Sequence, residues 1–563
     1  MASKRIVIVG GVAGGAACAT RLRRLDERAE ILILERGSAV SFANCGLPYY
    51  LGGVIPERGQ LLVATPERFR DWFRIEVRTH SEARSIDRAA RTVVVRDLHT
   101  EQEAIEPYDA LVLAPGAVPV RPPVSGLDLP GVFTLRNLDD CDRIHEWMAG
   151  RAIDRAVVIG GGYIGLEMVE NLCRRGAEVT VLERLEQVMP PMDPEMVAPV
   201  HEELRRQGVR LMLGNAVTAI EAGGPLGLIA AAADGDRIPA SIVLVSAGVK
   251  PDVALARAAG LRIGSLGGIA VDRQMHTSDP AVWAVGDAVE VPDFVTGQPT
   301  LVALAGPAVR QARVAADAIC GRPSRFRGAQ GTGVVGLFGL TLALTGASEK
   351  GLRRAGLPLQ KIYVHAPDHA SYFPGAQTMT IKLLFAPGDG RVLGAQAVGR
   401  GGVEKRIDVL ATAIQHGATV FDLEEAELCY APQYGSAKDP VNMAGFVAAN
   451  VLRGDVELAH WTEWPAPGQA AAAAEGPPGD LPPLVLDVRN PAEVAAARIP
   501  GSTAIPLVEL RGRLDELPAG RELWVHCAAG QRAYYACRIL TQHGFHARNL
   551  SGGLKTYQML RDH

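Results

Sequence analysis

Short apolar runs followed by glycine-rich turns dominate the first third of the chain. Arg5–Val9 is such a run, and a helical pattern at Ala16–Leu25 and a second apolar run at Glu30–Leu34 follow it. Short runs of consecutive apolar residues next to a glycine turn are typical of β-strands. The pattern therefore predicts a strand, a glycine turn, a helix and a second strand in succession.

The first turn has the residue types of a dinucleotide-binding site. It exposes backbone N–H groups at a helix N-terminus, which suits a pyrophosphate. Glu35, 20 residues after Gly15, ends the second strand, where a carboxylate can accept hydrogen bonds from ribose hydroxyls. Val12 stands where the motif usually has its second glycine, and an ordinary tight turn is the alternative. The candidate residues are Gly10, Gly11, Val12, Ala13, Gly15 and Glu35.

The same pattern occurs a second time. Ala156–Ile159 leads into a turn with all three glycines, and the strand Glu178–Leu182 ends in Glu183. Two such units predict two nucleotide cofactors. Glu183 would repel a 2′-phosphate and favours NADH, although Arg184 beside it could accommodate the phosphate of NADPH. The candidate residues are Gly160, Gly162, Tyr163, Ile164, Gly165 and Glu183.

Two further stretches carry a resemblance to a known superfamily. Tyr108–Ala117 is a strand with a tight exit, and Val282–Ala288 contains the pair Gly286-Asp287. Both resemble the flavoprotein disulfide reductase superfamily, which implies FAD, with Asp287 on its ribitol. The alternative is that Asp287 caps a helix starting near Ala288. The resemblance adds Ala114, Gly116, Gly248, Gly286 and Asp287 as cofactor-binding residues.

The order of these motifs predicts a divided first domain. Later residues read as strands followed by helices, such as Met379–Leu384 and Glu404–His416, and the resemblance implies a dimerisation domain there. A Pro- and Ala-rich stretch then reads as a linker that permits the approach of a last domain. The predicted boundaries are 1–115 with 245–330 for FAD, 116–244 for NAD(P)H, 331–450 for dimerisation, 451–480 for the linker and 481–563 for the last domain.

Several motifs lie in the last 80 or so residues. Asp487-Val488-Arg489 and Ile499-Pro500-Gly501 come first; Leu523–His526 then reads as a strand running into Cys527, and the loop to Arg532 precedes a helix. Together these motifs resemble a rhodanese domain. Inward N–H groups of such a loop stabilise a thiolate or a persulfide. The resemblance makes Cys527 the sulfur carrier, with Arg532 adding positive charge and fixing the loop. Arg498 stands where the family has a histidine, and Cys537 reads as core.

Cys45 lies in the stretch SFANCGLPYY, directly after the first nucleotide unit. The stretch resembles the coenzyme A disulfide reductase branch of the single-cysteine flavoproteins, in which the cysteine packs at the flavin. A lone cysteine must pair with a sulfur of the substrate or cycle through sulfenic acid. Oxidase and peroxidase members carry a histidine in the first glycine turn, whereas Val12 and Ala13 stand here, so a sulfur substrate is favoured.

The same resemblance supplies further site residues. Two tyrosines of the dimerisation region, Tyr372 and Tyr430, would reach the partner subunit's active site, where a phenol can protonate a leaving thiolate. Ordinary aromatic packing is the alternative, and Gln433 departs from the family's usual proline. Coenzyme A phosphates need cations. The candidate substrate residues are Arg21, Arg24, Ser41 and Asn44.

Composition and charge argue against several classes of partner and site. The net charge of −4 points to neither nucleic acid nor an acidic membrane surface. The eight cysteines are scattered without a C-x-x-C pair, which argues against a zinc site or a disulfide framework and favours the cytoplasm. The N-terminal run imitates a signal peptide, but its glycines fit a nucleotide turn better. No uncharged apolar run reaches the length of a membrane span.

The predicted fold class is α/β, with two Rossmann-like dinucleotide-binding domains, an α+β dimerisation domain and a C-terminal α/β rhodanese domain. The predicted protein is a homodimeric, FAD-dependent NAD(P)H reductase of coenzyme A disulfide, coenzyme A persulfide or polysulfide. Two alternatives remain open: an NADH oxidase or peroxidase that uses a cysteine sulfenic acid, and a sulfur-carrier or redox-sensing protein.

Overall fold

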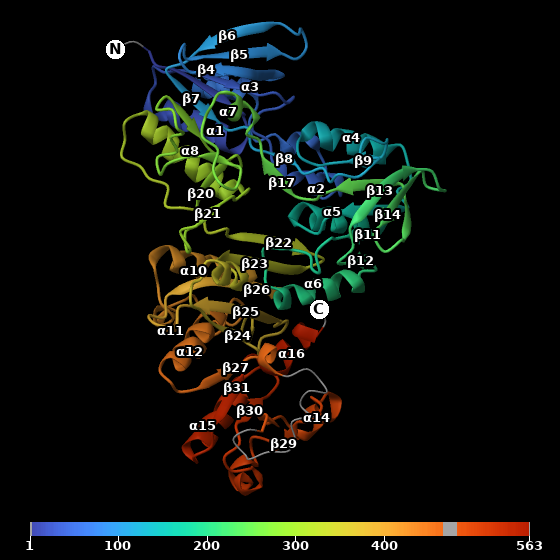
Figure 1. Ribbon diagram of the computed structural model, residues 1–563, viewed down its shortest axis with the longest axis vertical. Coiled ribbons are helices and arrows are strands. Elements are labelled where there is room, and N and C mark those ends of the chain that lie inside the picture. Colours follow the sequence, from blue (N-terminus) through green and yellow to red (C-terminus); the bar gives the residue numbers. More distant parts are fainter. Residues whose placement is uncertain (1–2, 465–480, 562–563) are drawn as a thin grey trace. The chain divides into compact units, whose positions relative to one another are not determined.

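The computed structural model describes residues 3–464 and 481–561 (Figure 1). The chain divides into two compact units. The first contains residues 1–190 and 204–331, and the second contains residues 191–203 and 332–563.

The first unit contains the parallel sheet predicted from the N-terminal pattern. Its strand order is β19-β7-β1-β2-β3. Helix α1 begins at Ala13, three residues before the predicted start, so the glycine turn itself enters the helix. The elements are β1 Arg5–Val9, β2 Glu30–Leu34, β3 Glu76–Arg78, β7 Ala110–Leu113 and β19 Val282–Ala284, with α1 Ala13–Leu25 packed against α8 Ala305–Ile319.

A second parallel sheet in the first unit confirms the second copy of the pattern. Its strand order is β12-β11-β10-β16-β9, and α5 follows β10 directly. The carboxyl ends of neighbouring parallel strands lie along one edge, so the turns after β10 and β11 meet there. The elements are β9 Val132–Phe133, β10 Arg155–Ile159, β11 Glu178–Leu182, β12 Arg210–Met212, β16 Ile242–Val245, α4 Leu138–Ala149 and α5 Tyr163–Arg174.

Smaller elements complete the first unit. Because β20 begins at Val289, no helix starts near Ala288, and the alternative reading of Asp287 as a helix cap is wrong. These elements are β4 Ser81–Asp87, β5 Thr92–Asp97, β6 Glu103–Pro107, β8 Ala117–Pro119, β13 Val217–Ala222, β14 Leu228–Ala232, β15 Arg237–Ala240, β17 Val249–Pro251, β18 Ile269–Ala270, β20 Val289–Pro292, β21 Pro299–Thr300, α2 Leu47–Leu51, α3 Pro66–Phe73 and α7 Ala254–Ala258.

The second unit opens with an antiparallel sheet of order β22-β23-β26-β25-β24. Helix α10 packs over β23 and β26, and α12 packs over β24 and β25. The elements are β22 Gly333–Leu337, β23 Leu340–Gly346, β24 Gln360–Pro367, β25 Thr378–Phe385, β26 Val392–Gly399, α6 Pro194–Arg206, α9 Glu349–Arg354, α10 Val403–His416, α11 Val420–Glu425 and α12 Pro440–Leu452.

The C-terminal domain is a parallel sheet of order β27-β31-β30-β28-β29. Strand β27 lies inside the predicted linker 451–480, yet it pairs with β31, so the domain begins before the Pro- and Ala-rich stretch. Residues 465–480 of that linker lie outside the described residues. The elements are β27 Glu457–Ala459, β28 Leu484–Asp487, β29 Thr503–Ala504, β30 Leu523–His526, β31 Ala547–Leu550, α14 Pro491–Ala496, α15 Gln531–Gln542 and α16 Gly553–Arg561.

The C-terminal domain contacts the antiparallel sheet through the start of α16. The His365 ring on β24 lies 2.9 Å from the Thr556 hydroxyl, and the Tyr363 N–H donates to the Ser551 hydroxyl. Burial lowers the pKa of His365 to about 3, so this ring is neutral at ordinary pH. These two hydrogen bonds are neutral, and the Lys555 ammonium adds a longer contact, at 3.4 Å, to the Thr378 hydroxyl on β25.

Candidate functional site

The first glycine turn has the geometry of a nucleotide cradle. A Cβ on Gly10 would lie 2.1 Å from the Ala114 carbonyl oxygen, and one on Gly15 would lie 1.8 Å from the Gly10 carbonyl oxygen. Only glycine permits this close approach of α1 to the strands. Helix α1 begins without a side-chain cap, which leaves its first N–H groups for an anion. The residues therefore fit the pyrophosphate of FAD.

Glu35 is held in place at the end of β2. Its two carboxylate oxygens accept the N–H groups of Gly11 and Gly37, each at 2.8 Å. The carboxylate thereby joins the glycine turn to the next loop and keeps further lone pairs for ribose hydroxyls. This arrangement agrees with the predicted role.

Asp287 lies at the carboxyl end of the same sheet, just past β19. The Arg136 guanidinium pairs with it at 3.1 Å and also donates to the Ala117 carbonyl. Burial raises the pKa of Asp287, and Arg136 opposes that shift. Gly116, at φ +74°, leaves the space that the Arg136 side chain fills, and Gly286, at φ +86°, turns the chain into Asp287. No local pattern pointed to Arg136.

The second glycine turn repeats this geometry. A Cβ on Gly165 would lie 2.1 Å from the Gly160 carbonyl oxygen, whereas Gly162 faces open space. Glu183 is buried, and it accepts the N–H groups of Gly161 and Leu185 at 2.7 and 2.8 Å. Tyr163 and Ile164 form the first turn of α5, and Gly248 lies between β16 and β17. These residues fit a second dinucleotide.

Cys45 lies in a short 3₁₀ turn, Asn44–Gly46, that leads into α2. It is exposed, and all eight cysteines of the chain, each of them described, are free thiols. Atoms around the thiol still desolvate it, and this burial raises the pKa of Cys45, with a further rise from the negative charges of Glu167 and Asp287. The Asn44 amide donates to the Arg136 carbonyl at 3.2 Å and fixes the turn.

Glu167 on α5 interacts electrostatically with Cys45, and no sequence pattern pointed to it. The Tyr49 hydroxyl donates to its carboxylate at 3.2 Å. Burial raises the pKa of Glu167 to about 7, so its charge changes close to neutral pH. Because the charge of Glu167 raises the pKa of the Cys45 thiol, the two groups are electrostatically coupled.

Replacing Glu167 with glutamine is expected to increase thiolate formation at Cys45. Above pH 7 the native carboxylate is charged and opposes the thiolate, so Glu167→Gln speeds alkylation of Cys45 by iodoacetamide about 3-fold there. Below about pH 6 the native side chain is already neutral, and the two proteins react alike. Peptide mass spectrometry of the holoenzyme measures the rates. Glu178→Gln, an exposed site on β11, is the control, and equal rates above pH 7 contradict the coupling.

A cavity of about 400 Å³ opens beside the first glycine turn. Its lining is largely apolar and includes Val12, Ser41 and Phe69, with Arg68 among the lining residues. Ser41 was a predicted substrate residue, whereas Arg68 was not. The full lining is Val12, Ala13, Ala16, Ala17, Thr20, Ser41, Phe42, Val63, Ala64, Arg68, Phe69 and Phe73.

The two predicted phosphate-binding arginines differ in their surroundings. Arg21 forms an ion pair with Asp317 at 2.7 Å, so its charge is already balanced. Arg24 is exposed on the same helix. Arg68 on α3 is exposed as well, stacks over the Trp72 ring at 4.2 Å and donates to a backbone carbonyl. Arg24 and Arg68 are therefore more exposed than Arg21, whose guanidinium is paired.

Tyr372 and Tyr430 meet in the second unit. Their hydroxyl oxygens are 2.6 Å apart, and the residues are 74% and 50% exposed. Buried Arg406 joins the two loops that carry them, because it donates to the Asp368 carbonyl on one side and pairs with Asp439 on the other. Both phenols are exposed, and Arg406 holds their loops in place. The alternative, ordinary aromatic packing, would have buried the two rings.

The Cys527 loop has the predicted form. Cys527 follows β30, α15 begins at Gln531, and the Gly530 N–H points to the Cys527 sulfur at 3.2 Å. The loop is backed by α16, since the Leu554 N–H donates to the Cys527 carbonyl. Cys537 is buried in the core of the domain, which confirms the prediction for it.

Arg532 is paired rather than free. Its two terminal nitrogens each lie 2.7 Å from a carboxylate oxygen of Glu493 on α14. The pair lowers the pKa of Glu493 to about 2. Arg489, which is buried and paired with Asp487, donates to the Glu493 carbonyl and so holds α14 in place. The expectation that Arg532 fixes the loop agrees with this geometry: its guanidinium hydrogen-bonds the Cys527 thiol, while Glu493 offsets part of its charge.

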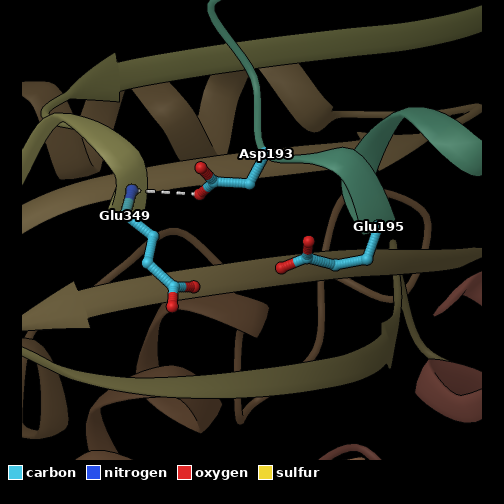
Figure 2. A group of neighbouring side chains, drawn as sticks. All are labelled: Asp193, Glu195 and Glu349. Atoms are coloured by element: carbon cyan, nitrogen blue, oxygen red, sulfur yellow. Dashed lines mark hydrogen bonds between the residues drawn. The ribbon is translucent and has the colours of Figure 1, made fainter. Parts of the chain in front are cut away.

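Three carboxylates gather in the second unit at spacings that could suit a metal ion. Figure 2 shows Asp193, Glu195 and Glu349 around one space, with the Glu349 N–H bonded to Asp193. The ammonium of fully buried Lys382 lies 2.9, 2.5 and 2.7 Å from these three carboxylates. The cluster therefore contains its own cation.

These features define a class of protein. Two dinucleotide cradles, an Asp287 site at the carboxyl end of the first sheet and an exposed cysteine between the cradles are the parts of a flavin- and nicotinamide-dependent oxidoreductase. The braced sulfur loop at Cys527 adds a rhodanese-type domain to it.

Comparison with known proteins places the chain within that class. The family model for pyridine nucleotide-disulphide oxidoreductases matches residues 4–312, its dimerisation domain matches 334–439, and a rhodanese-like domain matches 469–560. The chain belongs to the pyridine nucleotide-disulphide oxidoreductase family. Membership implies FAD and a pyridine nucleotide, and the glycine turns described above fit both.

Several relatives share most of this architecture. A coenzyme A disulfide reductase of Staphylococcus aureus is 34% identical over 79% of this chain and 99% of its own length. The structure of reduced Bacillus anthracis CoADR-RHD is 44% identical, with a TM-score of 0.95 over 100% of this chain and 98% of that one. An NAD-dependent persulfide reductase from A. fulgidus is 38% identical, with a TM-score of 0.89 over 98% and 100%.

Together, the family and the relatives show that the chain is an oxidoreductase of the kind that uses a pyridine nucleotide to reduce disulfides or persulfides. Among the helices of the described residues, none has the length and apolar character needed to cross a membrane.

Proposed function

We propose that this protein is an FAD-dependent, NADH-preferring reductase of low-molecular-weight disulfides and persulfides, coenzyme A disulfide and coenzyme A persulfide foremost. The observation that carries the proposal is Cys45: an exposed, unpaired thiol in the turn after the first nucleotide unit, coupled to Glu167 on the second. Buried Glu183 supports NADH, because a 2′-phosphate beside its carboxylate would be repelled.

The chemistry of a lone cysteine follows from sulfur exchange. The Cys45 thiolate attacks one sulfur of a disulfide R–S–S–R, forming a mixed disulfide and releasing one thiolate R–S⁻. When bound, FAD and the nicotinamide supply the two electrons that split the mixed disulfide into the Cys45 thiolate and a second thiolate. With a persulfide R–S–SH the products are a thiol and hydrosulfide. Glu167, whose pKa is raised to about 7, can hold or release a proton beside the sulfur.

The tyrosine pair supports a dimeric enzyme. Tyr372 and Tyr430 are exposed on the part of the chain that matches the family's dimerisation domain. In a homodimer the two phenols would lie against the partner's Cys45 site, where they donate hydrogen bonds to the leaving thiolate. Tyr372 and Tyr430 share one hydrogen bond, so a proton lost by one is replaced through the other.

Anaerobic oxidation of NADH tests the proposal. The purified holoenzyme is given coenzyme A disulfide, coenzyme A persulfide, glutathione persulfide, polysulfide or peroxide, each in turn, and NADH loss is followed. The sulfur substrates are expected to support turnover and peroxide is not. Oxygen or peroxide consumption without any sulfur substrate would instead identify an oxidase or peroxidase, and sulfur loading of Cys527 without NADH loss would identify a sulfur carrier.

Arg68 is expected to contribute to coenzyme A binding. Its exposed guanidinium at the 400 Å³ cavity suits a phosphate, and the apolar lining suits the chain that carries the thiol. Removing a hydrogen bond to a charged group costs about 1.5–3 kcal/mol, so Arg68→Gln is expected to raise KM for coenzyme A disulfide by about 10-fold or more. KM for polysulfide, which has no phosphate, stays the same.

Arg70 provides the matched control on the same helix. It is exposed, and it pairs with Asp71 at 2.8 Å. Arg70→Gln is expected to leave both KM values as they are. A rise in KM for polysulfide as large as that for coenzyme A disulfide would show that Arg68 supports the helix rather than the phosphate.

A further inference from the structure

The charge around the Cys527 loop is balanced almost completely. Arg532 is the one arginine or lysine of the loop 527–532, and both of its terminal nitrogens are bound by Glu493. Behind the loop, Asp487 and Arg489 neutralise each other at 2.6 Å. Burial lowers the pKa of His526 to about 4, which leaves this neighbouring ring neutral.

Lys555 is the first cation of α16, the helix that backs the loop. Its backbone N–H donates to the Ala528 carbonyl, but its ammonium lies 3.4 Å from the Thr378 hydroxyl on β25. The side chain therefore extends toward the antiparallel sheet. Within the described part of the C-terminal domain, no unpaired cation is placed in the loop itself.

The Arg532 guanidinium, although bound by Glu493, also hydrogen-bonds the Cys527 thiol, and the rest of the positive potential comes from the backbone. The Gly530 N–H points at the Cys527 sulfur, and the N-terminus of the 12-residue helix α15 follows immediately. A helix N-terminus carries about half an elementary charge. That potential suits one negative charge on a thiolate or persulfide, and it is too small to offset the two charges of a dianion approaching an anionic thiolate.

We propose that Glu493 sets the donor selectivity of the Cys527 loop: by neutralising Arg532 it favours persulfides of thiols, whose sulfane sulfur bears at most one negative charge, over dianionic thiosulfate. This inference rests on the proposed function, because it names the donor that supplies sulfur to the reductase chain. Glu493 also caps α14 by accepting the Asn490 N–H.

The loading step conserves electrons. The Cys527 thiolate attacks the outer sulfur of R–S–SH, the S–S bond of the persulfide breaks, and a new S–S bond to Cys527 forms. The products are Cys527–S–SH and the thiolate R–S⁻, with no net oxidation. With thiosulfate the leaving group would be sulfite, and the attack would bring a dianion against the thiolate and against Glu493.

The test compares donors on the holoenzyme without NADH. Thiosulfate and glutathione persulfide are the two probes, and peptide mass spectrometry follows the gain of one sulfur atom at Cys527. Glu493→Gln frees the charge of Arg532, and it is expected to raise the loading rate from thiosulfate about 10-fold relative to that from glutathione persulfide. Glu493→Asp, which keeps the charge, stays close to the native ratio. In Glu493→Gln/Arg532→Gln the gain with thiosulfate disappears.

A second readout separates charge from a loosened loop. The ratio of iodoacetate to iodoacetamide alkylation at Cys527 reports the local potential, since the two reagents differ chiefly in charge. It is expected to rise about 5-fold in Glu493→Gln. Glu516→Gln, which breaks a comparable surface pair with Arg513, leaves it unchanged.

Two results would overturn the inference. One is a donor ratio and an alkylation ratio that do not change in Glu493→Gln. The other is loss of loading from both donors with an unchanged alkylation ratio, which would make Glu493 a structural brace only. Failure of the reductase proposal appears separately, as absence of anaerobic NADH oxidation by the native enzyme.

Discussion

Replacing Cys45 with serine is expected to lower turnover of sulfur substrates by at least about a thousandfold, because serine cannot form the mixed disulfide that the reaction needs. The change is nearly isosteric, and Cys45 is exposed in its turn, so the fold is retained. Both glycine cradles are unchanged. Anaerobic NADH oxidation with coenzyme A disulfide measures the loss, and bleaching of the flavin by stoichiometric NADH shows that cofactor binding and hydride transfer persist.

Cys429 supplies the matched control, since it is the other exposed cysteine of the chain. Cys429→Ser is expected to keep at least about half of the native rate. Turnover of sulfur substrates by Cys45→Ser at the native rate would contradict the central proposal. Retention of sulfur loading at Cys527 in Cys45→Ser is expected, because the loop that carries Cys527 is complete within its own domain.

Replacing Lys382 with methionine is expected to destabilise the second unit by about 3–5 kcal/mol, because the change leaves buried carboxylates without a cation. Lys382 is fully buried, and Glu195 and Glu349 are paired with it at 2.5 and 2.7 Å. Thermal unfolding, followed by near-ultraviolet circular dichroism, measures the loss. Adding Glu195→Gln to Lys382→Met removes one uncompensated charge and is expected to restore part of the stability.

The pH dependence of this loss has a definite sign. Lys382 holds the pKa values of Glu195 and Glu349 below their ordinary range. A carboxyl with a depressed pKa stabilises the fold above its unfolded pKa, and the contribution is lost as the pH falls through the folded value. The native protein is therefore expected to lose stability in acid more steeply than Lys382→Met.

Arg353 provides the control for the cluster. It pairs with the same Glu349 but is 67% exposed, so Arg353→Gln is expected to cost less than about 1 kcal/mol. A bound metal ion in place of the ammonium would make a chelator lower the native melting temperature. An unchanged melting temperature in Lys382→Met would show that the carboxylates do not depend on this lysine.

Local patterns predicted a large part of the fold. The strands Arg5–Val9 and Glu30–Leu34 and the strand Leu523–His526 have the predicted bounds, because apolar runs and glycine turns are properties of short segments. Helix α10 begins one residue before its predicted start at Glu404. The same kind of pattern missed β27, because it is a three-residue strand that forms only by pairing with β31.

The site residues divide in the same way. Cys45, Cys527 and Glu35 stand beside turns that their own neighbours define, so their placement could be predicted from the sequence. The placement of Arg68 and Arg136 could not be predicted from the sequence, because neither belongs to a motif. Each lies beside residues that are distant along the chain. Arg136 meets Asp287 across 151 residues.

The sequence by itself determined two nucleotide turns, a lone cysteine without a second cysteine nearby and the Cys527 loop near the end of the chain. These features depend on residues within a few positions of one another. The tertiary structure alone decided how charge is distributed around them. Glu493 pairs with Arg532, which is 39 residues away along the chain, and Lys382 pairs with Glu195, which is 187 residues away. Whether two charges pair depends on their distance in space, and the apolar periodicity along the chain does not indicate that distance.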